Sequence, residues 1–197
     1  MTLLRVFIAV EIPLPIRQAI HDQTESLRAA LGRDLVRWVP LENMHLTLKF
    51  LGDVSPANVK FISRMLTAET KNCAPFSMQI GGLGSFPTSR RTRIIWIGIH
   101  APATLTSLQR GIESAAARLG YEAETRPFSP HLTIGRVRQQ VGASDQQKVR
   151  AALERSQVSM LGNADVAAVH LFQSDLKPTG AEYTRLFSAP LKYDSPR

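Results

Sequence analysis

The chain has 197 residues, of which 44% are hydrophobic and 20% are charged, so it can bury a core and is not disordered. Its one cysteine, Cys73, excludes an internal disulfide framework and any cysteine-rich zinc site. The net charge of +8 favours an anionic partner, most often a nucleic acid.

Strands and helices are predicted to alternate along the N-terminal half. The apolar run at 5–10 predicts a buried strand, and it is too short for a signal peptide or a membrane helix. We therefore expect a cytoplasmic protein without a membrane partner. The next predicted elements are a helix over 16–31 that Gly32 ends, a strand over 36–39, a strand over 43–51 and a helix over 55–70.

The C-terminal half continues with the same kinds of element. We expect a strand over 76–83, a loop over 84–93, a strand over 94–99 and a helix over 102–119. After these come a strand over 131–137, a helix over 144–156, and strands over 166–172 and 183–191 that are joined by a turn at 177–180.

The strand over 43–51 alternates between apolar and polar residues. Strict alternation places one set on the buried face: Met44, Leu46, Leu48 and Phe50. It places the other set on a polar face: Asn43, His45, Thr47 and Lys49. The pattern predicts a half-buried strand that presents polar side chains to solvent or to a ligand.

The order of elements indicates an internal duplication. An apolar strand, a helix and a strand that reads His-Leu-Thr occur twice in the same order. Ile94 follows Phe7 by 87 residues, and His131 follows His45 by 86 residues. Matching order and matching offset predict two similar lobes that face each other.

The repeated tetrapeptides are His45-Leu-Thr-Leu and His131-Leu-Thr-Ile. Random placement of this composition predicts about 0.02 such tetrapeptides, so two at equivalent places are a specific signal. On a strand, residues i and i+2 point to the same side, so each motif presents an imidazole beside the hydroxyl of Thr47 or Thr133.

Two such strands, one from each lobe, would bring two imidazoles and two hydroxyls into one cleft. One neutral imidazole can act as a base and one protonated imidazole as an acid, while the hydroxyls donate to the oxygens of a bound anion. This set suits in-line displacement at phosphorus without a metal. The residues alone do not say which histidine is the acid.

The paired motifs resemble those that define the 2H phosphoesterases, and in particular the RNA 2′,3′-cyclic phosphodiesterase branch, also called 2′-5′ RNA ligase. The resemblance covers most of the chain. Its other segments are 7–10, 37–40, 43–52, 84–87, 96–98, 130–136 and 174–186.

The resemblance implies a single domain over 1–197, with an α+β, bilobal, duplicated fold in which two antiparallel sheets line a central cleft and helices lie outside. It implies hydrolysis of a 2′,3′-cyclic phosphate at an RNA end to a 2′-phosphate. His45 would be the proton donor to the leaving 3′ oxygen and His131 the proton acceptor that activates water. Thr47 and Thr133 would hold the non-bridging oxygens.

Two further residues are expected at the substrate. Arg136 follows the second motif and would bind phosphate, for which guanidinium is well suited. Strict alternation places it on the face opposite His131, so this role requires a bulge at Gly135. Phe172 resembles an aromatic residue that lies near the terminal base in the family, although a core position fits it equally well.

Other interpretations of the same residues stay open. Reversible 2′-5′ RNA joining, hydrolysis of another cyclic nucleotide, or a non-catalytic RNA-end binding module would each use this cleft. No metal-ligand spacing and no phosphate-binding glycine loop are present in the sequence, so we expect no metal, no cofactor and no obligate protein partner. The loop with Arg90, Arg91 and Arg93 could steer RNA or be a solvated surface.

Overall fold

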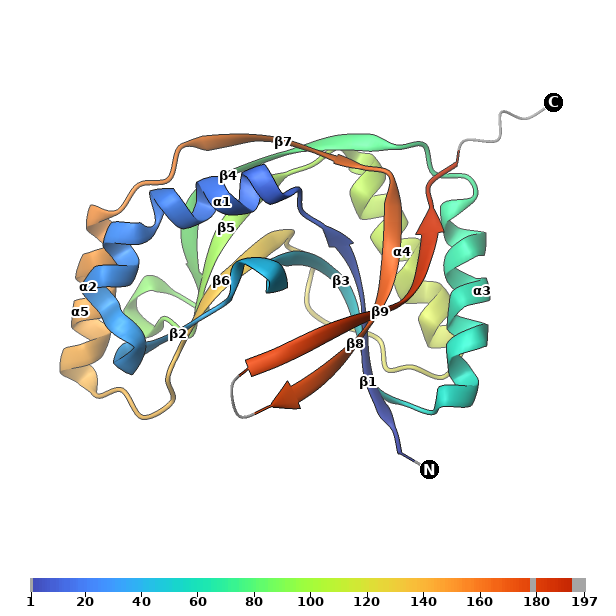
Figure 1. Ribbon diagram of the computed structural model, residues 1–197, viewed down its shortest axis with the longest axis horizontal. Coiled ribbons are helices and arrows are strands. Elements are labelled where there is room, and N and C mark those ends of the chain that lie inside the picture. Colours follow the sequence, from blue (N-terminus) through green and yellow to red (C-terminus); the bar gives the residue numbers. More distant parts are fainter. Residues whose placement is uncertain (1, 178–179, 193–197) are drawn as a thin grey trace.

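The computed structural model describes residues 2–177 and 180–192. They form two antiparallel sheets (Figure 1). The four-stranded sheet has the order β3-β1-β8-β9 and the five-stranded sheet the order β2-β6-β5-β4-β7. The α+β architecture and the paired antiparallel sheets that the resemblance implied are therefore confirmed.

The four-stranded sheet combines the two ends of the chain. Its strands are β1 (Leu4–Glu11), β3 (His45–Val54), β8 (Ala168–Lys177) and β9 (Gly180–Pro190). Strand β1 lies in the middle and is buried on both faces, which explains its continuous apolar run. Val6, Ile8 and Val10 enter the main core, whereas Phe7 and Ala9 face the other way.

The five-stranded sheet is built mainly from the middle of the chain. Its strands are β2 (Val36–Trp38), β4 (Phe76–Phe86), β5 (Ile94–His100), β6 (His131–Val137) and β7 (Met160–Val166). Strand β4 extends three residues beyond the predicted 76–83, so residues 84–86 are not loop. Strand β7 was not predicted at all, and the strand expected at 166–172 begins at Ala168 instead.

The helices cover the outer sides of the two sheets (Figure 1). Helices α3 (Val59–Thr70) and α4 (Ala103–Arg118) pack on the four-stranded sheet. Helices α1 (Leu14–Gln23), α2 (Glu25–Leu35) and α5 (Ala143–Arg155) pack beside the five-stranded sheet. Short 3-10 turns η1 (Leu41–Asn43), η2 (Pro56–Asn58) and η3 (Ser89–Arg91) connect these elements.

The helix predicted over 16–31 is two helices. Thr24 separates them, and its buried hydroxyl donates 2.7 Å back to the carbonyl of Ile20, which competes with continuation of the helix. Gly32 has φ 61°, a conformation that favours glycine, and interrupts the end of α2. The turn predicted at 177–180 includes Pro178 and Thr179, which lie outside the described residues. None of the helices in the described ranges is long and apolar enough to cross a membrane.

Candidate active site

The two His-x-Thr motifs begin strands that belong to different sheets. His45 and Thr47 lie on β3, and His131 and Thr133 lie on β6. The two strands contact each other where the sheets meet. In each motif the histidine and threonine are partly exposed and the leucine between them is buried, as alternation predicts.

Both imidazoles are oriented in the same way by the main chain. His45 Nδ1 lies 2.8 Å from the carbonyl oxygen of Asn43, and His131 Nδ1 lies 2.7 Å from that of Ser129. A carbonyl only accepts, so Nδ1 carries the hydrogen in both rings. Neither Nε2 has a hydrogen-bond partner among the described residues, so both remain available to a substrate.

A bulge follows the threonine in each motif. Ala9 pairs with Thr47 and Ile8 with Lys49, so the register skips one residue on β3. On β6 the same skip occurs: Trp96 pairs with Thr133 and Ile95 with Gly135. Each bulge turns the following residues over relative to strict alternation.

The bulges correct the predicted faces of Lys49 and Phe50. Lys49 is 5% exposed and lies behind the sheet, where its ammonium donates to a carboxylate oxygen of Glu113 on α4 and to the carbonyl of Glu122. Phe50 is 57% exposed, with its ring 5.7 Å from that of Phe7 on the cleft side. Strict alternation had assigned these two residues to the opposite faces.

The bulge on β6 also determines where Arg136 lies. Ile134 and Gly135 are both buried, and Arg136 is exposed, as His131 and Thr133 are in part. The charge of Arg136 acts on His45 in the other sheet and lowers the pKa of that imidazole. Arg136 is thus exposed on β6, and its charge influences the first motif from the other sheet.

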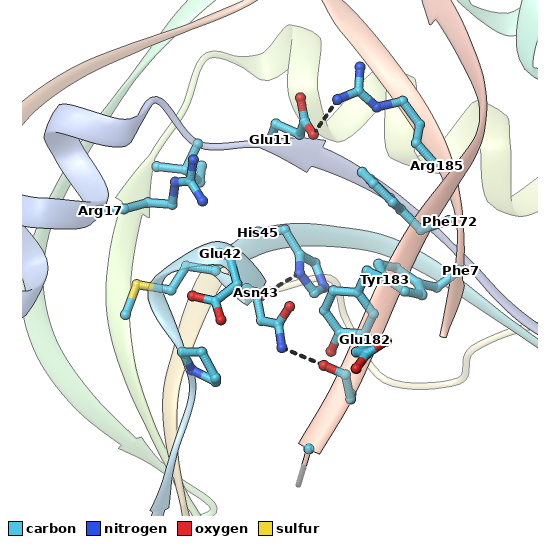
Figure 2. A pocket seen from close by; sticks show the side chains of 15 residues that line it. Phe7, Glu11, Arg17, Glu42, Asn43, His45, Phe172, Glu182, Tyr183 and Arg185 are labelled. Carbon is cyan, nitrogen blue, oxygen red and sulfur yellow. Dashed lines mark hydrogen bonds and ion pairs between the residues drawn. The ribbon is translucent and has the colours of Figure 1, made fainter. Parts of the chain in front are cut away.

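An aromatic wall surrounds His45, as Figure 2 shows. The ring of Phe7 stacks on the imidazole at 4.7 Å, and Tyr183 meets it edge-on at 5.3 Å. Phe172 stacks on Phe7 at 5.4 Å and is 8% exposed. Phe172 therefore belongs to the cleft side of the sheet and not to the main core, and it lines the cavity beside His45.

This environment keeps His45 uncharged in the free protein. Its pKa is lowered to about 4, mainly by burial and to a smaller extent by the positive charge of Arg136, against the opposing effect of the Asn43 carbonyl. At neutral pH the imidazole is therefore neutral. An acid role for His45 requires an additional negative charge in the cleft, which a phosphate group would supply.

A cavity of about 870 Å³ opens beside His45 (Figure 2). Asn43 donates 2.7 Å from its side-chain amide to the carbonyl of Ala181, which fixes η1 to strand β9. Opposite, Arg185 pairs with Glu11 at 2.9 Å. The wall thus combines aromatic surface with fixed polar groups, a combination that suits a nucleoside.

His131 is flanked by a second pair of aromatic rings. Phe86 meets the imidazole edge-on at 5.0 Å, and the Trp96 ring lies 6.4 Å away. The indole covers Gly84, where an added Cβ would lie 2.2 Å from Trp96 Cζ2. This glycine is therefore required by the close approach of the ring, a role that the predicted loop over 84–93 did not include.

Sequence reasoning did not single out two arginines, Arg5 and Arg37, whose charges act on Tyr183. Burial raises the pKa of Tyr183, while the positive charges of Arg136, Arg5 and Arg37 act in the opposite direction. Arg37 pairs with Arg136 in the register of β2 and β6. Only this register, which joins residues 99 positions apart, could have identified Arg37.

The remaining histidines lie outside the paired motifs. His170 lies 2.9 Å from the Ser188 hydroxyl and 3.7 Å from Glu11, and burial lowers its pKa. Within 2–177 and 180–192, no three His, Cys, Asp or Glu side chains gather in a way that could hold a metal ion.

The chain is similar to known proteins in family, in sequence and in structure. The family model described as "LigT like Phosphoesterase" matches the chain twice, over residues 10–96 and 97–183. An RNA 2′,3′-cyclic phosphodiesterase of Methanothermobacter thermautotrophicus is 33% identical over 180 residues, 91% of this chain and 95% of that protein. One of Archaeoglobus fulgidus is 30% identical over 183 residues, covering 93% and 98%.

Solved structures agree with these matches. TT0787 of Thermus thermophilus superimposes with a TM-score of 0.79 at 25% identity, covering 97% of this chain and all of that one. Escherichia coli LigT in complex with 3′-AMP gives a TM-score of 0.72 at 27% identity, covering 96% and 98%. The two consecutive family matches coincide with the duplication that the sequence indicated, and the chain belongs to the LigT-like phosphoesterases of the 2H superfamily.

Proposed function

We propose that this protein hydrolyses 2′,3′-cyclic phosphates at RNA ends to 2′-phosphomonoesters, without a metal or a cofactor, through His45 and His131. The observation that carries the proposal is the matched pair of imidazoles, each with Nδ1 bound to a main-chain carbonyl and Nε2 free of partners among the described residues. The names of the Methanothermobacter and Archaeoglobus relatives support the substrate class.

The proposed reaction is an in-line displacement at phosphorus. Nε2 of His131 accepts a proton from water as the water oxygen bonds to phosphorus, and the bond to the 3′ oxygen breaks. Nε2 of His45 donates a proton to that leaving oxygen, so the product has a 3′ hydroxyl and a 2′-phosphate. Each positioned imidazole contributes about 10²–10⁴-fold to the rate.

The other cleft residues act on charge and position. The hydroxyls of Thr47 and Thr133 donate to the two non-bridging phosphoryl oxygens, and Arg136 offsets their negative charge. The terminal base packs against the aromatic wall of the cavity that Phe172 lines. The assignment of His45 as proton donor and His131 as proton acceptor follows the resemblance to the 2H phosphoesterases. The hydrogen bonds do not distinguish the two imidazoles, because each Nδ1 is bound to a main-chain carbonyl.

The proposal is tested with an oligoribonucleotide that ends in a 2′,3′-cyclic phosphate, incubated with the protein in EDTA. The expected product is the 2′-phosphate, identified by mass and by comparison with 2′- and 3′-phosphate standards. His45→Gln and His131→Gln should each lose the activity, while His100→Gln, an exposed histidine at the end of β5, should keep it.

The outcomes separate the proposal from its alternatives. A 3′-phosphate product, or loss of activity in EDTA, would contradict the proposed mechanism. RNA binding without any change of the end group would favour the binding-module hypothesis. Activity on cyclic mononucleotides alone would move the substrate to that class.

A further inference from the structure

A second hollow, of about 780 Å³, lies outside the cavity beside His45. We call it the basic hollow. Its charged lining residues are Arg90, Arg91 and Arg93, from the connection between β4 and β5, and Arg150 from α5. No aspartate or glutamate lines it in the part of the chain that the structure describes. The cavity beside His45, by contrast, is lined by three glutamates.

The positive charge of the basic hollow is largely uncompensated. Arg90, Arg91 and Arg93 form no ion pair and donate no side-chain hydrogen bond to any described residue, and all three are exposed. Arg150 pairs with Glu154 on its own helix at 2.7 Å. Since guanidinium groups match phosphate oxygens in geometry and charge, the hollow suits a phosphate-bearing ligand.

The loop that carries these arginines is anchored on three sides. Thr92 is fully buried, and its hydroxyl donates to the carbonyls of Thr88 and Ser89. The side-chain amide of Gln146 on α5 donates to the carbonyl of Thr92. The backbone N–H of Arg93 donates 2.7 Å to the carbonyl of Phe86 on β4. The arginines therefore project from a fixed backbone, which lowers the entropy cost of binding.

The segment that lines the basic hollow is directly connected to residues near His131. Pro87, which lines the hollow, directly follows Phe86, whose ring contacts His131. The carbonyl of Arg93 accepts 2.9 Å from Val137 N–H, next to Arg136 of the cleft. An RNA whose terminal phosphate lies between the histidines would therefore need to extend only past Phe86 and Arg136 to approach these arginines.

We infer that the basic hollow binds the phosphate backbone of single-stranded RNA upstream of the terminal nucleotide, an inference that rests on the proposed function. Several separate guanidinium groups with no acidic neighbour in the lining exceed what one phosphate requires, and they match a chain of phosphates. The hollow therefore makes the enzyme favour RNA ends over free cyclic nucleotides.

The test measures the binding of two ligands by Arg90→Gln/Arg91→Gln, together with its turnover of 2′,3′-cyclic AMP. The first is a labelled single-stranded oligoribonucleotide of about ten nucleotides with a 2′-phosphate end, followed by anisotropy at several salt concentrations. The second is 2′-AMP. The matched control is Arg64→Gln/Lys71→Gln, which removes two charges at α3, at the opposite end of the molecule from α5 (Figure 1).

The double variant should bind the oligoribonucleotide at least about tenfold more weakly than the wild type. Its slope of log affinity against log salt should fall by about 1.4, since each lost phosphate contact on a single strand removes about 0.7. Affinity for 2′-AMP and turnover of 2′,3′-cyclic AMP should not change. The control should bind both ligands like the wild type.

Two results would overturn the inference. One is an oligoribonucleotide affinity and salt slope equal to those of the wild type. The other is an equal loss for 2′-AMP, which would make the hollow part of the end-binding site. If the wild type turns over neither 2′,3′-cyclic AMP nor an oligoribonucleotide with a 2′,3′-cyclic phosphate end, the proposed function fails, while the binding measurements still decide on the hollow.

Discussion

Occupation of the cleft by an oxyanion should raise the pKa of His45 from about 4 to about 7. In the free protein, burial and the charge of Arg136 hold the imidazole neutral, so about one ring in a thousand is protonated at pH 7. An anion about 4 Å away, at an effective dielectric constant of about 20, favours the charged ring by about 4 kcal/mol. That energy changes its acid dissociation constant about a thousandfold.

The sign of the pH dependence follows from these two values. The complex holds a proton on His45 between pH 4 and about pH 7 that the free protein lacks, so binding takes up a proton there. Affinity for the anion should therefore rise as pH falls through this window. The substrate would supply the charge that makes His45 a competent acid at neutral pH.

The measurement is an NMR titration of the imidazole protons with and without sulfate, a tetrahedral anion that keeps its charge over this range. His21 on α1 is an internal reference that sulfate in the cleft should not affect. Arg136→Gln should raise the pKa of His45 in the free protein, because it removes a cation that lowers it. A free His45 that titrates near its ordinary value, or a pKa that sulfate does not move, would refute the reasoning.

Three further predictions concern stability and the shape of the site. The pKa of His45 is about 4 in the folded protein and 6.5 in the unfolded chain. The free energy of unfolding should therefore fall by about 3 kcal/mol as pH falls from 6.5 through 4. Denaturant titrations should show this loss in the wild type and not in His45→Gln. Lys49→Met should lower the free energy of unfolding by about 3–5 kcal/mol, because the Glu113 carboxylate is left without its cation. Adding Glu113→Leu should restore much of this stability. Equal stability of the single variant Lys49→Met and the double variant would contradict the prediction. Gly84→Ala should displace the Trp96 ring, which lies beside His131, and so reduce turnover. The expected readouts are a changed indole fluorescence and a lower kcat. An unchanged emission spectrum would count against the close approach of the ring to Gly84.

Most of the strands could be predicted because buried strands and amphipathic helices have distinct periodicities. Strand β7 escaped prediction because Gly162, Asn163 and Asp165 have little preference for strands. It lies at the edge of its sheet and pairs with β4 alone, so tertiary pairing determines its conformation. Residues 84–86 joined β4 for a similar reason, since β5 pairs with them along their whole length.

The candidate site could be predicted only where strand periodicity holds. The side-by-side placement of His45 and Thr47 follows from a period of two. The bulge after Thr47, which reverses Lys49 and Phe50, follows from pairing with β1 and leaves no mark in a single sequence. The stacking of Phe7 on His45 likewise depends on the register of β1 and β3.

The four-stranded sheet pairs the early strands β1 and β3 with the late strands β8 and β9, so the site can be completed only after β8 and β9 have been synthesised. Strand β1 pairs with β8, so Ile8 cannot pair with Leu171 until β8 has been synthesised. The last strand, β9, supplies Tyr183 against the His45 ring and the Ala181 carbonyl that holds Asn43. A nascent chain that already contains both histidines therefore lacks the support that orients the first one.

Such long-range closure implies slow, late maturation of the four-stranded sheet. Pulse-labelled hydrogen exchange during refolding should show protection of β1 and β3 only after β8 and β9 have paired. A chain still without β9 would therefore carry both histidines while lacking the contacts that orient His45, so the arrangement around this histidine is completed only when β9 has paired.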